Sequence, residues 1–166
     1  EVVVVLYAVK VKGNFFCIGD NVARQPERGR EIIRRGHAIE KHSKQHRHYF
    51  SLLGISGFTR EIQAAQETIF SITGVRPKFF RAPAGLRNPF LEPVLHRLGL
   101  RLASWTVRGF DTQVNDVAKV KSKLLSGLPS GAILLIQYGN AANTKAGIPV
   151  FPAVLHSLLV SAERNN

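Results

Sequence analysis

Two kinds of hydrophobic pattern follow one another along the chain. Short apolar runs, typical of buried strands, are separated by segments in which apolar residues recur every three or four positions, as on one face of a helix. The predicted strands are Asn14–Ile18, His37–Lys41, Lys78–Ala82, Leu100–Val107 and Ala132–Gln137. The predicted helices are Pro26–Arg35, Thr59–Thr73, Pro89–Leu98, Val114–Leu125 and Pro152–Glu163. Strands that alternate with helices in this way predict an α/β fold, built from βαβ units around a parallel sheet or barrel.

Several predicted helices have recognisable ends. Pro26 suits the first turn of its helix and Gly36 ends it. Thr59 suits the N-cap of the next helix, and Gly74 stops it. The face of that helix that we expect to be buried contains Ile62, Ala65, Ile69 and Ile72. The segment Val2–Val11 stays open between strand and helix, because its β-branched content favours a strand while its place before another strand suits a helix.

Composition indicates one ordered globular domain. The chain has 166 residues, of which 45% are apolar, enough for a sizeable core. The single cysteine, Cys17, lies in an apolar run and is interpreted as a small buried hydrophobe rather than a catalytic thiol. No apolar run approaches the ~18 residues that a membrane span requires. The opening residues do not have the pattern of a signal peptide, although the chain could be a mature or trimmed product.

The formal net charge of +12 at pH 7 favours polyanionic partners such as nucleic acid, phosphates or acidic cell-envelope polymers. The arginines are scattered, however, and no basic stripe with interleaved aromatic residues occurs. Specific nucleic-acid binding is therefore only a minor hypothesis.

Four of the six histidines fall within residues 36–48. Two of them, His42 and His46, are four positions apart, which on a helical turn would place both rings on one face, about 5–6 Å apart at Cβ. Two converging neutral imidazoles are a common start of a site for zinc or a related divalent metal. A hydrolytic metal site also needs a third protein ligand and an open position for water. The alternative is a basic, solvated segment that happens to be rich in histidine.

Further candidates follow the predicted strands, because functional residues of α/β folds collect at the carboxyl ends of strands. Arg81 could hold a carboxylate or a substrate oxyanion, or form a structural salt bridge. Asp111 could be functional or could cap a turn or helix. Trp105 and Leu135 stand in the same regions, and residues of these types are more often found in a core than in a pocket wall.

Taken in order, these segments resemble the polysaccharide deacetylase family, the NodB-like or chitin-deacetylase-like carbohydrate esterases. Lys12–Gly19 is similar to the family's second strand, and residues 36–46 contain its H-[ST]-x-x-H motif. Residues 81–85 are similar to its R-x-P-x-G motif, with Ala84 where an aromatic residue is usual. Asp111 matches the aspartate of the fourth motif, although Thr112 stands where many members have tryptophan. Residues 133–137 match the fifth motif, [IV]-x-L-x-H, except that its last position is Gln137.

The resemblance implies a fold and a chemistry. The fold would be an irregular, open (β/α) barrel, with residues 1–166 as a single domain. His42 and His46, together with an aspartate, would hold a divalent metal, usually zinc, which activates a water to attack an N- or O-acetyl group of a carbohydrate polymer. Arg81 would orient the general base, and the N–H of Ala84 would help to stabilise the oxyanion. Leu135 would line the acetyl pocket, and Trp105 would also contact the substrate. A histidine of the fifth motif would protonate the leaving group.

The sequence departs from this pattern at several catalytic positions. The family's metal ligand and general base lie in an Asp-Asp segment of its first strand, and no Asp-Asp pair occurs here; Asp20 belongs to another part of the pattern. Gln137 replaces the general-acid histidine and cannot donate a proton to a leaving group at neutral pH. Each acid or base group contributes ~10²–10⁴ in rate, so we expect little turnover. Arg81 is expected to turn toward Asp111, another carboxylate or solvent.

We expect this chain to lack the first strand of the family's barrel and also its last strand. Open sheet edges invite pairing, so we expect an open barrel, a homo-oligomer or part of a longer protein. Two functional hypotheses remain: an impaired metal-dependent deacetylase acting on an acetylated polysaccharide or oligosaccharide, and a non-catalytic glycan-binding or scaffold protein of the same fold. The resemblance implies a place in the cell envelope or outside the cell.

Overall fold

The computed structural model describes residues 3, 6–7, 10–108, 116–126, 131–136, 143, 154–155 and 158–159. The chain divides into two compact units. Residues 10–104 form one, and residues 1–9 together with 105–166 form the other.

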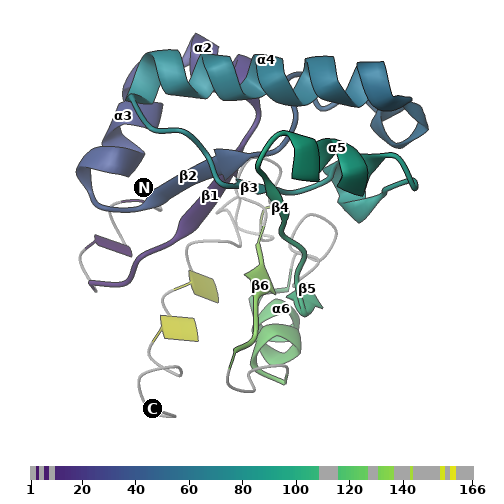
Figure 1. Cartoon of the computed structure of the whole chain (residues 1–166). Coiled ribbons are helices and arrows are strands. Elements are labelled where there is room, and N and C mark those ends of the chain that lie inside the picture. The colour runs from purple at the N-terminus through teal and green to yellow at the C-terminus, as the bar shows by residue number, and fades with distance from the viewer. Residues whose placement is uncertain are drawn as a thin grey trace. The chain divides into compact units, whose positions relative to one another are not determined.

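The unit of residues 10–104 contains a four-stranded sheet in the order β1-β2-β3-β4 (Figure 1). Its strands are β1 (Asn14–Cys17), β2 (Ala38–Lys41), β3 (Phe79–Phe80) and β4 (Arg101–Leu102). The connecting helices are α2 (Gly19–Arg24), α3 (Pro26–Arg34), α4 (Ile55–Thr73) and α5 (Leu91–Arg97). Two single 3-10 turns, η1 (Phe50–Leu52) and η2 (Pro83–Gly85), precede α4 and α5. All neighbouring strands are parallel, which confirms the predicted α/β class.

The register of this sheet aligns the carboxyl ends of its four strands. The paired last residues are Cys17 with Lys41, Lys41 with Phe80, and Phe80 with Leu102. The residue that follows each strand therefore lies at one common edge of the sheet. His42 follows β2 and Arg81 follows β3 at this edge, so two of the predicted site residues are neighbours because of the register.

Helix α4 lies along one face of the sheet, with α2 and α3 beside it (Figure 1). Its buried side chains are Phe58, Ile62, Ala65 and Ile69, spaced by four, three and four positions as in an amphipathic helix. Gly74 ends the helix in the left-handed conformation with φ 71°, as predicted. The helix starts at Ile55 rather than at Thr59, so the prediction of Thr59 as N-cap is wrong. Thr59 lies inside the helix, and its hydroxyl donates to the carbonyl of Ile55 at 2.8 Å instead of capping an end.

The core of this unit joins α4 and α5 to the sheet. An aromatic cluster forms part of it: the rings of Phe50 and Phe58 meet edge to face at 5.0 Å, and Phe50 stacks on Phe80 at 5.7 Å. The remaining buried members of the core are Ile62, Ala82, Leu91, Val94, Leu95 and Leu100. This packed layer supports the strand ends at which His42 and Arg81 emerge.

The second unit contains a parallel pair of strands, β5 (Val107–Arg108) and β6 (Leu134–Leu135), and the helix α6 (Val117–Leu125). Its described core contains Val120, Leu124, Val154 and Leu158. The predicted strand Leu100–Val107 is therefore wrong as one element, since β4 and β5 belong to different sheets. The carbonyls of Ala103 and Ser104, between the two strands, accept hydrogen bonds from the Arg81 side chain.

Other predicted elements agree with the structure to different extents. Helix α2 was not predicted, because six residues are too short to show a helical period. In the open segment Val2–Val11, the described residues Val3, Leu6 and Tyr7 are helical. The predicted helix Pro152–Glu163 lies mostly outside the described residues, of which 154–155 and 158–159 are helical. Within the described part of the chain, no helix combines the length and the apolar character needed to cross a membrane. Closure into an open barrel, and the single domain, stay predictions.

Candidate functional site

His42 is held at the carboxyl edge of the sheet by its backbone and by its ring. Its N–H donates to the carbonyl of Cys17 at 3.0 Å, and the N–H of Arg81 donates to the carbonyl of Lys41 at 2.9 Å. The ring nitrogen Nδ1 lies 2.8 Å from the carbonyl oxygen of Arg81. Because a carbonyl only accepts, Nδ1 carries the proton and Nε2 keeps its lone pair. This is the arrangement by which a backbone carbonyl orients a metal-binding histidine.

The protonation state of His42 also suits a ligand. Burial lowers the pKa of the ring to about 4, with a hydrogen bond to the Arg81 carbonyl acting in the opposite direction. The imidazole is therefore neutral at pH 7, as metal coordination requires.

His46 approaches His42 through a loop, not through the helical turn on which the spacing argument rested. Ser43 and His46 both have left-handed backbones, with φ of 68° and 55°. The buried hydroxyl of Ser43 accepts a hydrogen bond from the N–H of His46 at 2.8 Å. The two imidazole centroids end 4.9 Å apart with an interplanar angle of 50°. The structure thus corrects the local conformation and still brings the two rings together.

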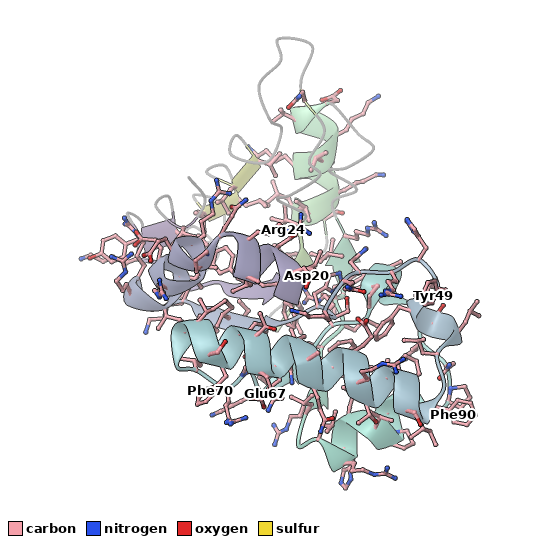
Figure 2. The ribbon with its side chains drawn as sticks, turned by 90° about the horizontal axis from the view of Figure 1, so that it is seen from above. Asp20, Arg24, Tyr49, Glu67, Phe70 and Phe90 are labelled. Carbon is pink, nitrogen blue, oxygen red and sulfur yellow. The ribbon has the colours of Figure 1, made fainter. Side chains whose placement is uncertain are left out.

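Lys44, between the two histidines, is bound to helices on both sides. Its Nζ lies 3.0 Å from Asp20 Oδ1 on α2 and 2.9 Å from Thr68 Oγ1 on α4. Its backbone N–H donates to Glu61 Oε2 of α4 at 3.2 Å. Asp20 and Arg24 mark α2 beside α4 in Figure 2. These contacts were not predicted; the only signal in the sequence is that Asp20 follows a strand.

Arg81, whose carbonyl contacts the His42 ring, has a buried side chain. Its side chain is 9% exposed, and its guanidinium carbon lies 3.8 Å from the centroid of the Phe16 ring. Nε and one terminal nitrogen donate to the carbonyls of Ala103 and Ser104 at 3.4 and 3.2 Å. Burial lowers the pKa of this guanidinium, which nevertheless stays protonated at any ordinary pH. Asp111 lies outside the described residues, so its pairing with Arg81 stays a prediction.

Ala84 is exposed in the middle of the turn η2 and has a left-handed φ of 53°. The turn is closed by two hydrogen bonds, from Gly85 N–H to Ala82 and from Leu86 N–H to Pro83, at 2.9 and 3.0 Å. Neither bond uses the N–H of Ala84. A left-handed alanine costs roughly 1–2 kcal/mol, and such strain is concentrated at functional sites.

The two histidines fit a divalent metal as two of its ligands. His42 offers a neutral, oriented Nε2, and the ring of His46 lies beside it. Among the described residues, no group of three or more histidine, cysteine, aspartate or glutamate side chains is placed to hold a metal. The fit is therefore partial, and a third protein ligand has to come from outside the described part of the chain.

The other predicted site residues lie elsewhere. Trp105 and Leu135 belong to the second unit, where the N–H of Thr106 donates to the carbonyl of Ile133 at 3.0 Å and joins their two segments. Leu135 is 9% exposed and Trp105 is half-buried. Asp111 and Gln137 lie outside the described residues. The substrate role of Trp105 and Leu135 stays a prediction.

Comparison with known proteins assigns the family. The sequence profile of the family "Polysaccharide deacetylase" matches residues 1–103. This chain therefore belongs to the polysaccharide deacetylase family. It is 29% identical to the peptidoglycan-N-acetylglucosamine deacetylase PgdA of Listeria monocytogenes, over 76% of this chain and 26% of PgdA. It is 27% identical to a chitooligosaccharide deacetylase of a Bradyrhizobium strain, over 84% of this chain and 64% of the relative. The chain thus spans about a quarter of one relative and just under two thirds of the other.

Solved structures show the same fold. A family 4 carbohydrate esterase pseudoenzyme from Bacillus anthracis aligns with a TM-score of 0.88 at 17% identity, over 99% of this chain and 55% of that one. A family 4 carbohydrate esterase from Streptomyces lividans, in complex with acetate, aligns with a TM-score of 0.79 at 27% identity, over 95% and 80%. An acetyl xylan esterase from Clostridium thermocellum, in complex with a cobalt ion, aligns with a TM-score of 0.82 at 19% identity, over 97% and 75%.

Proposed function

We propose that this chain belongs to a protein that binds a divalent metal, zinc in the first place, through His42 and His46 and removes acetyl groups from a carbohydrate polymer. The observation that carries the proposal is the geometry of the histidine pair. The carbonyl of Arg81 fixes the proton of His42 on Nδ1, and the ring of His46 lies 4.9 Å away. Membership of the polysaccharide deacetylase family supports the choice of acetylated glycans as substrate.

A divalent metal bound there would lower the pKa of a water molecule and polarise an acetyl carbonyl. The residues of this chain would supply the surroundings. Ala84 offers a backbone N–H from an exposed, strained position in η2, which suits a developing oxyanion. Arg81 keeps a positive charge beside the pair, held by the carbonyls of Ala103 and Ser104. Its proposed role is to orient a carboxylate that acts as the base.

Gln137 favours a second candidate function. At the place where the family motif has its general-acid histidine, a glutamine cannot protonate a leaving amine. We propose on this ground that turnover is weak. The alternative is that the protein binds glycan without hydrolysing it, as a pseudoenzyme of the same fold.

Metal binding is the first test. The purified chain is stripped with a chelator and titrated with zinc, with metal content measured after dialysis. We expect His42→Ala and His46→Ala to lose the bound metal, and His48→Ala to keep it. His48 is a matched control because it lies in the same segment and is exposed. Wild-type protein that retains no zinc would rule out the metal-dependent function.

Turnover is the second test, measured as acetate released from an acetylated chito-oligosaccharide. Because no Asp-Asp pair occurs in this chain, the test uses a longer protein in which an Asp-Asp segment precedes residue 1. We expect Gln137→His in that protein to raise the rate by about 10²–10⁴-fold, because that is the usual contribution of a general acid. If this longer Gln137→His protein is loaded with zinc, binds the oligosaccharide and still releases no acetate, the non-catalytic alternative is favoured.

A further inference from the structure

The loop that carries His46 is strained and needs support. Ser43 and His46 are left-handed at φ of 68° and 55°, and neither is glycine. Each such residue costs roughly 1–2 kcal/mol, and the conformation persists only where surrounding contacts impose it. The contacts that impose it should therefore set the position of the His46 ring.

Most of these contacts converge on Lys44. Its ammonium bridges Asp20 Oδ1 on α2 and Thr68 Oγ1 on α4, at 3.0 and 2.9 Å. Its N–H donates to Glu61 at 3.2 Å and its carbonyl accepts from the N–H of Asp20 at 3.0 Å. Backbone and side chain of this one residue are thus both fixed to the two helices that flank the loop.

The aliphatic part of the Lys44 side chain is also closely packed. A Cβ at Gly19 would lie 3.0 Å from Lys44 Cδ and 3.2 Å from the Cα of Ala65. The absence of a side chain at residue 19 therefore makes room for the lysine stem against α4. The N–H of Gly19 also donates to the carbonyl of Ser43 at 3.1 Å.

We propose that Lys44 is a positioning residue, which ties the loop of residues 43–46 to α2 and α4 and so fixes the ring of His46 against His42. The inference rests on the proposed metal site, since its consequence is the geometry of that site. Lys44 does not touch the metal; it acts through the backbone two residues before His46. Removal of its ammonium should loosen His46 more than His42, which is held independently by the Arg81 carbonyl.

The test compares Lys44→Met, which keeps the stem and loses the charge, with Lys44→Arg and with the control Lys12→Met. Lys12 is an exposed lysine far from the loop in sequence, so the control makes the same chemical change elsewhere. The probe is cobalt(II) alone, whose visible spectrum reports coordination geometry. We expect Lys44→Met to bind cobalt at least about tenfold more weakly than wild type and to show an altered spectrum. Substitution of residues that support metal ligands usually has an effect of this size. Lys44→Arg should recover part of the cobalt affinity and part of the wild-type spectrum. Lys12→Met should match wild type in both affinity and spectrum.

If wild type binds cobalt and Lys44→Met binds it equally with the same spectrum, the inference is wrong while the proposed function stands. If wild type binds no cobalt, the proposed function fails, and histidine-ring NMR of the metal-free protein decides the inference. Shifted His46 signals in Lys44→Met, with His42 signals retained, support it; unchanged His46 signals overturn it. Should Lys44→Met fail to fold, Gly19→Ala displaces the same stem and is judged by the same two readouts.

Discussion

The Nδ1 atom of His42 and the carbonyl oxygen of Arg81 lie 2.8 Å apart, although the two residues are 39 positions apart in the sequence. The contact joins the residues that follow β2 and β3. It depends on the strand register that pairs Lys41 with Phe80, because that pairing places the next residue of each strand side by side. A backbone carbonyl cannot be removed by substitution, so the tautomer of His42 is built into the fold.

The first prediction concerns that tautomer. We expect long-range proton–nitrogen NMR to show the His42 proton on Nδ1 and an unprotonated Nε2 at pH 7. Since burial lowers the pKa of His42 to about 4, the ring should keep this state until the pH falls toward that value. Zinc should shift the Nε2 signal and leave the Nδ1 proton in place. A proton found on Nε2 of the metal-free protein would contradict the assigned orientation.

The second prediction compares two aliphatic side chains of equal size. Ile62 is fully buried in the core between α4 and the sheet, and Leu52 is 82% exposed in η1. Ile62→Ala should lower the free energy of unfolding by about 2–5 kcal/mol, through lost burial and a residual cavity. Leu52→Ala should change it by no more than about 0.5 kcal/mol. Urea denaturation measures both, and similar losses would mean that α4 is not packed on the core as described.

The third prediction concerns the start of α6. A carboxylate oxygen of Asp116 accepts hydrogen bonds from the N–H groups of Ala118 and Lys119 at 2.9 and 3.2 Å. Asp116→Ala should therefore cost about 1 kcal/mol of unfolding free energy, the usual value of an N-cap. Asp116→Asn keeps an acceptor oxygen and should retain most of it. Equal losses in thermal unfolding of the two variants would show that the cap contributes nothing through these bonds.

The elements that could be predicted are those whose signals are local. The apolar run before Gly19 and the punctuation by Pro26 and Gly36 placed β1 and α3 within a residue or two of their observed ends. The start of α4 was missed because the Thr59 hydroxyl has two local bonding choices, and the helix extends through Phe58 into the core. Sequence spacing cannot decide between such competing local bonds.

The site shows the same division. The pairing of His42 with His46 could be predicted from the spacing and the family motif, but its conformation could not. That conformation depends on contacts of Lys44 with Asp20 and Thr68, each 24 positions away. Lys41 is a second example: a lysine at a strand end suggests a solvated side chain, yet it is fully buried and bonds Gln66 on α4. Long-range polar contacts of this kind leave no periodic signal.

The fourth prediction concerns Cys17, the final residue of β1. Burial raises the pKa of its thiol to about 12. An unfolded cysteine ionises near pH 8.5, so at pH 8 the folded thiolate is rarer by roughly three orders of magnitude. We therefore expect alkylation of native protein to be correspondingly slow, and to become fast in denaturant. Rapid modification of the native protein would contradict the buried environment.

The same shift makes stability fall at alkaline pH. Between pH 8.5 and 12 the folded state keeps a proton that the unfolded state has lost, so the free energy of unfolding decreases as pH rises. The decrease due to this thiol is at most about 1.4 kcal/mol for each pH unit. Lys41 opposes it, because burial lowers the pKa of that lysine to about 8. Comparison with Cys17→Ala isolates the thiol: the variant should lose less stability than wild type between pH 8.5 and 10, and parallel curves would contradict the prediction.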